Sequence, residues 1–221
     1  MQFTWKPRRQ LFQVRLSTML AAVVVCAAVL WIVAQEINAK RQERAAIAAI
    51  RLSGGGILYD WQAAAFPNEA LAAPPGPAWA RKLLGDDFFA QVFQVNLTGD
   101  GISADLTKLR NLHEARALIF EGASVSGLEN LGYFEKLETL DLIGTNITDK
   151  DVKYLRRVRS LRVLFLGGTK ITDAALRDLE HLNQLWYLDV SRTPITTPGS
   201  RALAAALPSC DVVTEPVNFG H

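Results

Sequence analysis

Histidine and cysteine are scarce in this sequence, which has three histidines and two cysteines among 221 residues. His113, His181 and His221 do not have the spacing of metal ligands, and neither an H-x-x-x-H nor a C-x-x-C motif occurs. Cys26 lies in an apolar run, whereas Cys210 lies near the end of the chain, so a bond between them is not expected. A disulfide would need a second chain, and Cys210 is expected to pack as a small apolar residue. The sequence therefore predicts no metal site and no cofactor.

An excess of charge of one sign is also missing from most of the chain. Residues 1–33 carry four basic residues and no acidic one, while the remainder holds 20 bases and 22 acids. A nucleic-acid-binding domain usually carries a pronounced basic patch or stripe. The nearly neutral body therefore argues against nucleic acid as the partner.

Catalytic constellations are equally sparse. Asp86 and Asp87 form an adjacent acid pair, but Phe88 and Phe89 follow them and no base or nucleophile motif is near. Gly54–Gly56 lacks the strand–turn–helix context of a phosphate loop and is expected to end a helix instead. We therefore predict a protein that is not an enzyme.

A long apolar run is present near the N-terminus. Residues 16–34 contain no charged side chain, and at about 1.5 Å per residue a helix of this length nearly covers the hydrocarbon core of a bilayer. Trp31 lies where an interfacial aromatic is expected. The alternative is a cleaved signal peptide that ends near Ala34, but this run exceeds the usual 7 to 15 residues. An uncleaved transmembrane helix over 16–34 is the favoured prediction.

The basic residues on the two sides of this run give only a slight preference for orientation. Residues 1–15 form a basic tail with Arg8, Arg9 and Arg15, while four bases also follow the run within residues 35–51. Residues 35–51 are expected to continue as a juxtamembrane helix. The positive-inside rule favours a cytoplasmic tail and places the rest of the chain on the extracytoplasmic side.

A repeat of 24 residues organises the second half of the chain. Leu137, Leu161 and Leu185 are 24 residues apart, and four further sets keep the same step. These sets are Leu140, Leu164 and Leu188; Thr145, Thr169 and Thr193; Ile147, Ile171 and Ile195; and Leu155, Leu179 and Leu203. A fixed period of this length is typical of a solenoid.

Each period has an internal order that elementary geometry explains. An L-x-x-L-x-L segment predicts a short strand with its leucines in the core, and a Gly-Thr or Arg-Thr pair then turns the chain. Thr148-Asp149 and Thr172-Asp173 are expected to start short helices through side-chain oxygens that cap backbone N–H groups. In the third copy, Thr197 and Pro198 are expected to do the same, with Pro198 at the first helical position.

These motifs resemble the leucine-rich-repeat family, specifically its 24-residue L-x-x-L-x-L-x-G-T-x-I-T-D variety, which is common in bacterial membrane-anchored proteins and has relatives in the recognition arms of ubiquitin-ligase adaptors. Thr145, Thr169 and Thr193 replace the asparagine usual at the inner turn. The resemblance implies an α/β fold, a short solenoid with a parallel sheet on its concave face and helices outside. It says little about the ligand.

Two weaker units, containing Val92–Leu97 and Ala115–Phe120, precede the clear copies and bring the total to about five repeats. We predict the repeats at 92–207, an N-terminal cap at 52–91 and a C-terminal closure at 208–221. Repeat arrays need such caps because their terminal units leave a core edge open. Within the cap we expect a strand at 57–61, a proline-rich loop at 62–78 and a helix at 79–89.

The candidate binding surface consists of side chains that alternate with the core leucines and so face outward from the concave sheet. The predicted partner-binding residues are Asn96, Ile119, Glu121, Thr139, Asp141, Val163, Phe165, Tyr187 and Asp189. Aromatic anchors beside carboxylates are typical of protein-recognition surfaces. A basic convex segment from Lys150 to Arg159 is expected to be solvated, with contact to anionic lipid as the alternative.

Together these observations predict a single-pass membrane protein whose repeats bind a protein partner, as a scaffold or adhesion module without catalysis. The alternative is an accessory or sensor subunit of a membrane enzyme or transporter complex. In that case the partner would also contact residues 16–51.

Overall fold

The computed structural model describes residues 16–65 and 73–215. The predicted basic tail, residues 1–15, lies outside the described residues, as do residues 216–221 of the predicted closure. The chain divides into two compact units, Met1–Arg41 and Gln42–His221.

Helix α1 (Leu16–Leu52) runs without a break through both predicted segments, 16–34 and 35–51. Alanine, leucine and other good helix formers dominate it, and it contains neither glycine nor proline. Residues 19–39 are exposed in the structure. Among the described residues, one helix, Met19–Leu52, is long and apolar enough to cross a membrane, although a signal sequence meets the same criteria.

The last turns of α1 belong to the second unit, where Ala46, Ile47 and Ile50 are buried in the hydrophobic core. A separate juxtamembrane segment up to residue 51 was expected, so the structure assigns more of this helix to the repeat-bearing unit. Gly55 allows the approach, since a Cβ atom there would lie 2.6 Å from the Leu97 side chain and 2.7 Å from that of Ile50.

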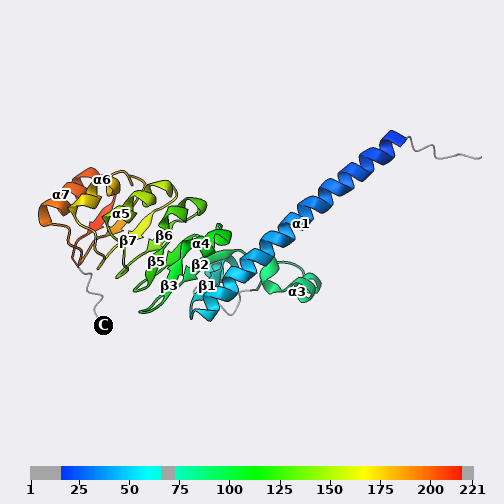
Figure 1. The fold of residues 1–221 in the computed structure, drawn as a ribbon, viewed down its shortest axis with the longest axis horizontal. Coiled ribbons are helices and arrows are strands. Elements are labelled where there is room, and N and C mark those ends of the chain that lie inside the picture. The colour runs from blue at the N-terminus through cyan, green and yellow to red at the C-terminus, as the bar shows by residue number, and fades with distance from the viewer. Residues whose placement is uncertain (1–15, 66–72, 216–221) are drawn as a thin grey trace, which may run out of the picture. The chain divides into compact units, whose positions relative to one another are not determined.

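The second unit is built on a seven-stranded sheet with the order β1-β2-β4-β6-β7-β8-β9 (Figure 1). Its strands are β1 (Gly56–Tyr59), β2 (Val92–Asn96), β4 (Ala117–Ile119), β6 (Thr139–Asp141), β7 (Val163–Phe165), β8 (Tyr187–Asp189) and β9 (Asp211–Val213). Strand β1 pairs antiparallel with β2, and every later pairing is parallel. Strands β3 (Ser103–Asp105) and β5 (Ser124–Ser126) form a second, two-stranded parallel sheet.

Short helices return the chain from each strand to the next, as Figure 1 shows for α5, α6 and α7. The α-helices of the repeats are α4 (Leu106–Leu109), α5 (Asp149–Val152), α6 (Leu176–Leu179) and α7 (Thr197–Ala206). The 3-10 helices are η3 (Arg110–Leu112), η4 (Leu128–Tyr133), η5 (Lys153–Arg157) and η6 (Asp173–Ala175). The predicted alternation of strands and helices around a leucine core is confirmed.

Three local predictions about elements need correction. Helix α7 is capped by Thr196 rather than Thr197, because the Thr196 hydroxyl accepts from the Gly199 amide at 3.1 Å and Pro198 then occupies the second helical position. Part of the expected proline-rich loop is helical, as α2 (Asp60–Ala65). The closure also contributes a parallel strand, β9, so the sheet extends beyond residue 207.

The expected helix over residues 79–89 is broken into two pieces. Helix α3 (Ala78–Leu84) ends at Gly85, whose φ of 95° interrupts the helix, and η2 (Asp86–Phe88) follows. Ala80 is the buried residue of α3, whereas Trp79 and Leu83 are 73% and 77% exposed. Two large apolar side chains of this segment are therefore solvent-exposed.

Threonine hydroxyls close the turn that follows each strand. Those of Thr145, Thr169 and Thr193 each donate to a backbone carbonyl three residues earlier, at 2.7 Å. These bonds lie within one repeat. At the inner turn, where related repeats usually have asparagine, each threonine hydroxyl therefore bonds a carbonyl of its own repeat and not the backbone of the neighbouring repeat.

Carboxylates supply the polar link between neighbouring repeats. Asp149 accepts from the Thr172 amide at 2.7 Å and the Thr172 hydroxyl at 2.8 Å. Asp173 accepts in the same way from the amide and hydroxyl of Thr196, at 2.8 and 2.6 Å. The Thr-Asp pair thus has two functions, since its threonine caps a helix and its aspartate binds the next threonine along the solenoid.

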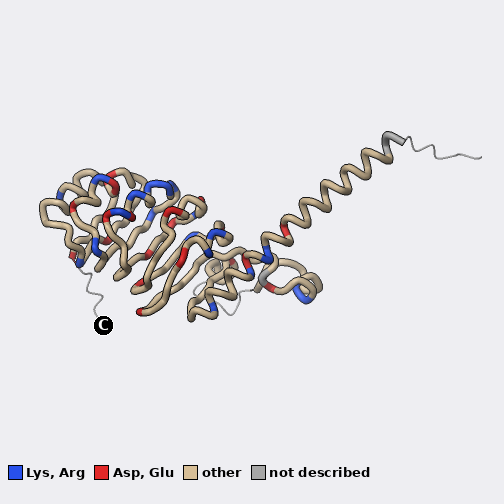
Figure 2. Tube along the Cα trace, in the orientation of Figure 1, with Lys and Arg blue, Asp and Glu red and all other residues tan. Residues whose placement is uncertain are grey.

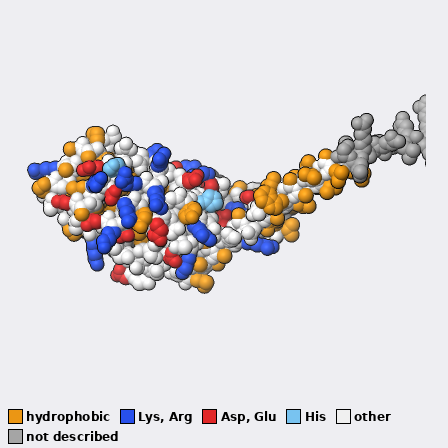
Figure 3. All heavy atoms as spheres, turned by 45° about the horizontal axis from the view of Figure 1, so that its top comes forward, with side chains coloured by type: hydrophobic (Ala, Val, Ile, Leu, Met, Phe, Trp, Pro, Cys, Tyr) orange, Lys and Arg blue, Asp and Glu red, His pale blue; other side chains and the backbone are white. Residues whose placement is uncertain are grey.

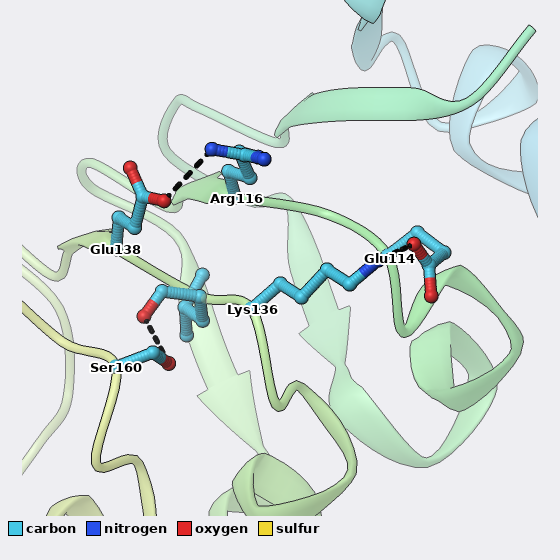
Figure 4. Close-up of polar contacts among 6 residues, drawn as sticks. Glu114, Arg116, Lys136, Glu138 and Ser160 are labelled. Carbon is cyan, nitrogen blue, oxygen red and sulfur yellow. Dashed lines mark hydrogen bonds and ion pairs between the residues drawn. The ribbon is translucent and has the colours of Figure 1, made fainter.

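Ion pairs on the loops before the strands add further links between repeats (Figure 4). Arg116 contacts Glu138 at 2.9 Å, Lys136 pairs with Glu114, and the Ser160 hydroxyl donates to the Leu137 carbonyl at 2.8 Å. Such exposed pairs stabilise a fold only slightly, by about 0.2–1 kcal/mol each. Figure 2 shows that Lys and Arg lie close to Asp and Glu at several places along the repeats.

Candidate binding surface on the concave sheet

The parallel register confirms which outward side chains lie side by side. One row crosses the sheet through Gln94, Ala117, Thr139, Val163, Tyr187 and Asp211. The second row passes through Asn96, Ile119, Asp141, Phe165, Asp189 and Val213. Neighbouring strands lie about 4.8 Å apart, so residues of one row contact each other directly.

The predicted binding residues fall on this face, but their exposure varies. Glu121 is exposed, whereas Ile119, Thr139, Asp141, Val163, Phe165 and Tyr187 are half-buried. Asp189 is only 9% exposed, and its Oδ1 accepts a hydrogen bond from the Ser191 amide at 2.8 Å. Side chains in one row shield each other because the strands are close, which the sequence pattern does not reveal.

Asn96 contributes less than expected to the exposed surface. Its side-chain oxygen is buried and has no hydrogen-bond partner in the structure. Asn96 pairs with Gly56 of the antiparallel strand β1, which covers this end of the sheet. The amide oxygen of Asn96 is therefore not available to a partner.

Aromatic side chains gather on β7 and β8. The Phe165 and Tyr187 rings lie 5.2 Å apart between centroids, and Trp186 contacts Tyr187 edge-on at 6.2 Å. Trp186 is 58% exposed. Trp186 was not among the predicted binding residues, because position 186 points away from the concave face in the alternating pattern. Exposed aromatic rings are the side chains that most often anchor protein interfaces.

A hollow of about 440 Å³ lies beside these rings. Its lining residues are Glu121, Ile143, Gly144, Phe165, Gly167, Gly168, Tyr187, Asp189, Ser191 and Arg192. Gly167 takes the position that Ile143 has in the preceding repeat, so a side chain is missing there and space opens. A Cβ atom at Gly167 would lie 3.1 Å from both Asp189 Oδ2 and Ser191 Oγ.

Arg192 was not among the predicted binding residues. It has a φ of 54°, in the left-handed region, while the matching turn positions are glycines, Gly144 at 65° and Gly168 at 69°. The signal was present in the sequence, because Arg192 replaces the glycine of the repeat motif. A bulky residue at this backbone conformation is unusual and costs on the order of 1 kcal/mol.

The carboxylates on this face influence each other. Burial raises the pKa of Asp141 above 3.8, and the negative charges of Glu121 and Asp189 raise it further, although a hydrogen bond from the Ile143 amide opposes the change. Burial also raises the pKa of the Tyr187 phenol above 10.0, and the negative charges of Asp189 and Asp211 raise it further. This end of the concave face is therefore negatively charged and partly shielded from water.

Residues considered for other chemistry do not gather into a second site. Among the described residues no group of three or more His, Cys, Asp or Glu side chains is arranged to hold a metal ion. Cys210 packs against the core as predicted, and burial raises the pKa of its thiol to about 11. His181 bonds the Arg177 carbonyl, and His113 lies 3.6 Å from Glu114.

The comparison with family models agrees with this geometry. A family model described as leucine rich repeat matches residues 135–195, which include β6, β7 and β8. The repeating strand, threonine turn and helix, together with this match, identify residues 135–195 as leucine-rich repeats. A search of curated proteins found no match.

Solved structures with a similar fold come from bacteria and plants. An internalin from Listeria monocytogenes is 23% identical over 53% of this chain and 32% of its own, with a TM-score of 0.44. A leucine-rich-repeat protein of Leptospira interrogans is 16% identical over 63% and 40%, with a TM-score of 0.43. The ectodomain of the receptor kinase SOBIR1 from Arabidopsis thaliana is 12% identical over 79% and 92%, with a TM-score of 0.48. This chain spans less than half of the two bacterial structures.

Proposed function

We propose that this chain is a single-pass membrane protein that presents a small leucine-rich-repeat domain to a protein partner, as a non-catalytic scaffold or adhesion module. The observation that carries the proposal is the pair of Phe165 and Tyr187 rings at a hollow on the concave sheet, with the exposed Trp186 ring packed edge-on against Tyr187. These rings have no role in the core, and exposed aromatic clusters are typical of interaction sites.

The membrane part of the proposal rests on α1, whose residues 19–39 are exposed and mainly apolar. Such a surface is unfavourable in water and favourable in a bilayer. We place the repeats on the extracytoplasmic side, following the basic residues before the span.

The anchor is tested by sequencing the N-terminus of the protein isolated from membranes and by extracting those membranes with alkaline carbonate. An intact N-terminus and retention in the pellet support the anchor. A new N-terminus near Ala34, or release into the supernatant, contradicts it.

Partner binding is tested by affinity capture from native membranes with the full-length chain as bait. The matched baits carry Phe165→Ala with Asp141→Ala, or Arg177→Ala on the helix side of the repeats. We expect a partner that the wild type and Arg177→Ala retain and the double variant loses, while all three baits show native circular dichroism. Equal retention by the double variant would exclude the concave face.

An accessory-subunit role remains the second candidate because residues 19–39 of α1 are exposed along their whole length. Polar substitutions at Ala21, Ala22, Ala27 and Ala28 distinguish the two candidates. Loss of a membrane complex while insertion is retained supports the subunit role, whereas an unchanged complex supports the scaffold.

A further inference from the structure

The hollow on the concave sheet combines two aromatic rings with several carboxylates. Phe165 lies in the row between Asp141 and Asp189, one strand away from each. Tyr187 contacts Phe165 at a centroid distance of 5.2 Å, and Glu121 and Asp189 both line the hollow. An aromatic face flanked by carboxylates attracts a cation by two effects, the ring quadrupole and the negative charge.

The carboxylates of this face have no partner of opposite charge within the described part of the chain. On the loops before the strands, Glu114 and Glu138 pair with lysine and arginine of the neighbouring repeat (Figure 4). No ion pair of this kind involves Glu121, Asp141 or Asp189 among residues 16–65 and 73–215. Over the face shown in Figure 3, Lys and Arg side chains likewise lie among Asp and Glu.

Arg192 is the basic residue that lines the hollow. It makes no ion pair with a carboxylate among residues 16–65 and 73–215, and its single positive charge beside Glu121 and Asp189 leaves an excess of one negative charge in the lining when both carboxylates are ionised. Asp141, one strand away from Phe165, adds a further negative charge to this face. The three carboxylates are not arranged as a metal-binding group. A lysine or arginine side chain matches both features of the hollow, because its aliphatic part can lie on the rings and its charged end can reach a carboxylate.

We propose that this hollow, defined by Glu121, Phe165, Gly167, Tyr187 and Asp189, receives a lysine or arginine side chain from a basic segment of the protein partner. The inference rests on the proposed function and specifies the chemistry of the partner. A volume of about 440 Å³ accommodates one long basic side chain with its neighbouring backbone. The side chain would place its aliphatic part on Phe165 and Tyr187 and its charged end at one of the two carboxylates that line the hollow, Glu121 or Asp189.

The absent side chain at position 167 gives the proposal a steric component. Gly167 is not in the left-handed region, so other residues can adopt its backbone conformation. Alanine there would reach the Asp189 and Ser191 oxygens at 3.1 Å, and a leucine would occupy the hollow. A larger residue should therefore block the site without removing any charge.

The test measures binding of a short fluorescent lysine–glycine peptide to the full-length chain in nanodiscs of uncharged phosphatidylcholine, by fluorescence anisotropy. Peptides with acetylated lysine and with glutamate in place of lysine serve as probes for charge. The variants are Glu121→Gln with Asp189→Asn, Phe165→Leu, Gly167→Leu and Arg192→Gln. Glu180→Gln, an exposed acid on the helix side, is the matched control for loss of one charge.

We expect the lysine peptide to bind and the acetylated and glutamate peptides not to bind. The double carboxylate variant should weaken binding by about tenfold or more, and Phe165→Leu by about three- to tenfold. Arg192→Gln should strengthen binding, and Glu180→Gln should leave it unchanged. Asp189→Asn keeps an oxygen that accepts from the Ser191 amide, and thermal melting of each variant confirms that it is folded.

Three outcomes overturn the inference. These are no binding of the lysine peptide to the wild type, equal binding of the acetylated peptide, and equal weakening by Glu180→Gln and the double variant. The proposed function is judged separately by affinity capture. If a partner is captured through Phe165 but the lysine peptide does not displace it, the concave face is still the interface. The proposal that this face binds a basic side chain is then wrong.

Discussion

The turn after each strand depends on two residues with separate tasks. A buried threonine such as Thr169 donates its hydroxyl to the Leu166 carbonyl at 2.7 Å, and the residue before it adopts a left-handed conformation. Glycine adopts that conformation freely at Gly144 and Gly168, whereas Arg192 does so against its steric preference. The last turn of the motif therefore stores strain at a residue that lines the hollow.

Replacing Arg192 with glycine should stabilise the fold by about 0.5–1 kcal/mol, because the strain at φ 54° is relieved. Gly168→Ala should destabilise it by about 1 kcal/mol for the opposite reason, as a Cβ there meets nothing closer than 3.6 Å and only the backbone is strained. Chemical denaturation measures both changes. Equal stability of Arg192→Gly and the wild type would show that the turn is unstrained.

The pKa values of two aspartates in the repeats should be shifted in opposite directions from the usual value of 3.8. The hydroxyl and amide of Thr196 hold the pKa of Asp173 below 3.8, whereas burial and then Glu121 and Asp189 raise the pKa of Asp141 above it. Carboxyl NMR titration should give values on opposite sides of 3.8, and Thr196→Val should raise the value of Asp173. Indistinguishable values for the two would contradict this account of the carboxylates.

These shifts determine how stability depends on pH. Asp173 has a lowered pKa in the folded state, so it contributes stability above pH 3.8 that is lost as the pH falls through its folded pKa. Asp141 has a raised pKa, so its charge opposes folding at neutral pH and the opposition disappears as the pH falls toward 3.8. Asp141→Asn should therefore raise the melting temperature at pH 7, and this gain should shrink near pH 4.

Neighbouring repeats are joined by hydrogen bonds that Thr172 donates to Asp149 and Thr196 donates to Asp173. Asp149→Ala should destabilise the domain by about 1.5–3 kcal/mol, since it removes bonds from a charged acceptor and leaves the Thr172 amide without its partner. Thermal or chemical unfolding measures the loss. Lys150→Ala is the control at the next, exposed position, and an equal effect of the two variants would show that the bonds contribute nothing.

The strands were more predictable than the cap, for a physical reason. Leu140, Leu164 and Leu188 recur at a fixed step because each faces the same environment, so the register followed from the sequence. Trp79 and Leu83 have no counterpart in the repeats. Their hydrophobicity alone did not indicate that both side chains are exposed. Strand β9 was missed because Asp211–Val213 lacks the leucine pattern, although it completes the open sheet edge.

The candidate binding surface was predictable in position and less so in detail. Alternation placed Asp141, Phe165 and Tyr187 on one face, as the register shows. The hollow depends on Gly167, where a side chain is absent, and on the left-handed Arg192. Both features arise from three-dimensional packing between repeats, so spacing alone did not reveal them.

At the scale of the molecule, the domain that carries the repeats begins within α1. Ile47 and Ile50 are 5% and 2% exposed, and both belong to the core of the second unit. A fragment starting at Leu52 would lose these side chains, and their burial contributes up to about 1.5–3 kcal/mol each. A fragment starting at Gln42 should be more stable by about 3–5 kcal/mol in chemical denaturation. Equal stability of the two fragments would place the boundary after α1.

The central claim is that the concave sheet is the surface at which the partner binds. A photocrosslinking amino acid placed at Phe165 in the full-length chain, in native membranes, tests this claim directly. The account predicts a covalent adduct with a protein partner from position 165 and none from the control position Arg177 on the helix side. An adduct from Arg177 and none from Phe165 would contradict the account and move the interface to the helix side of the solenoid.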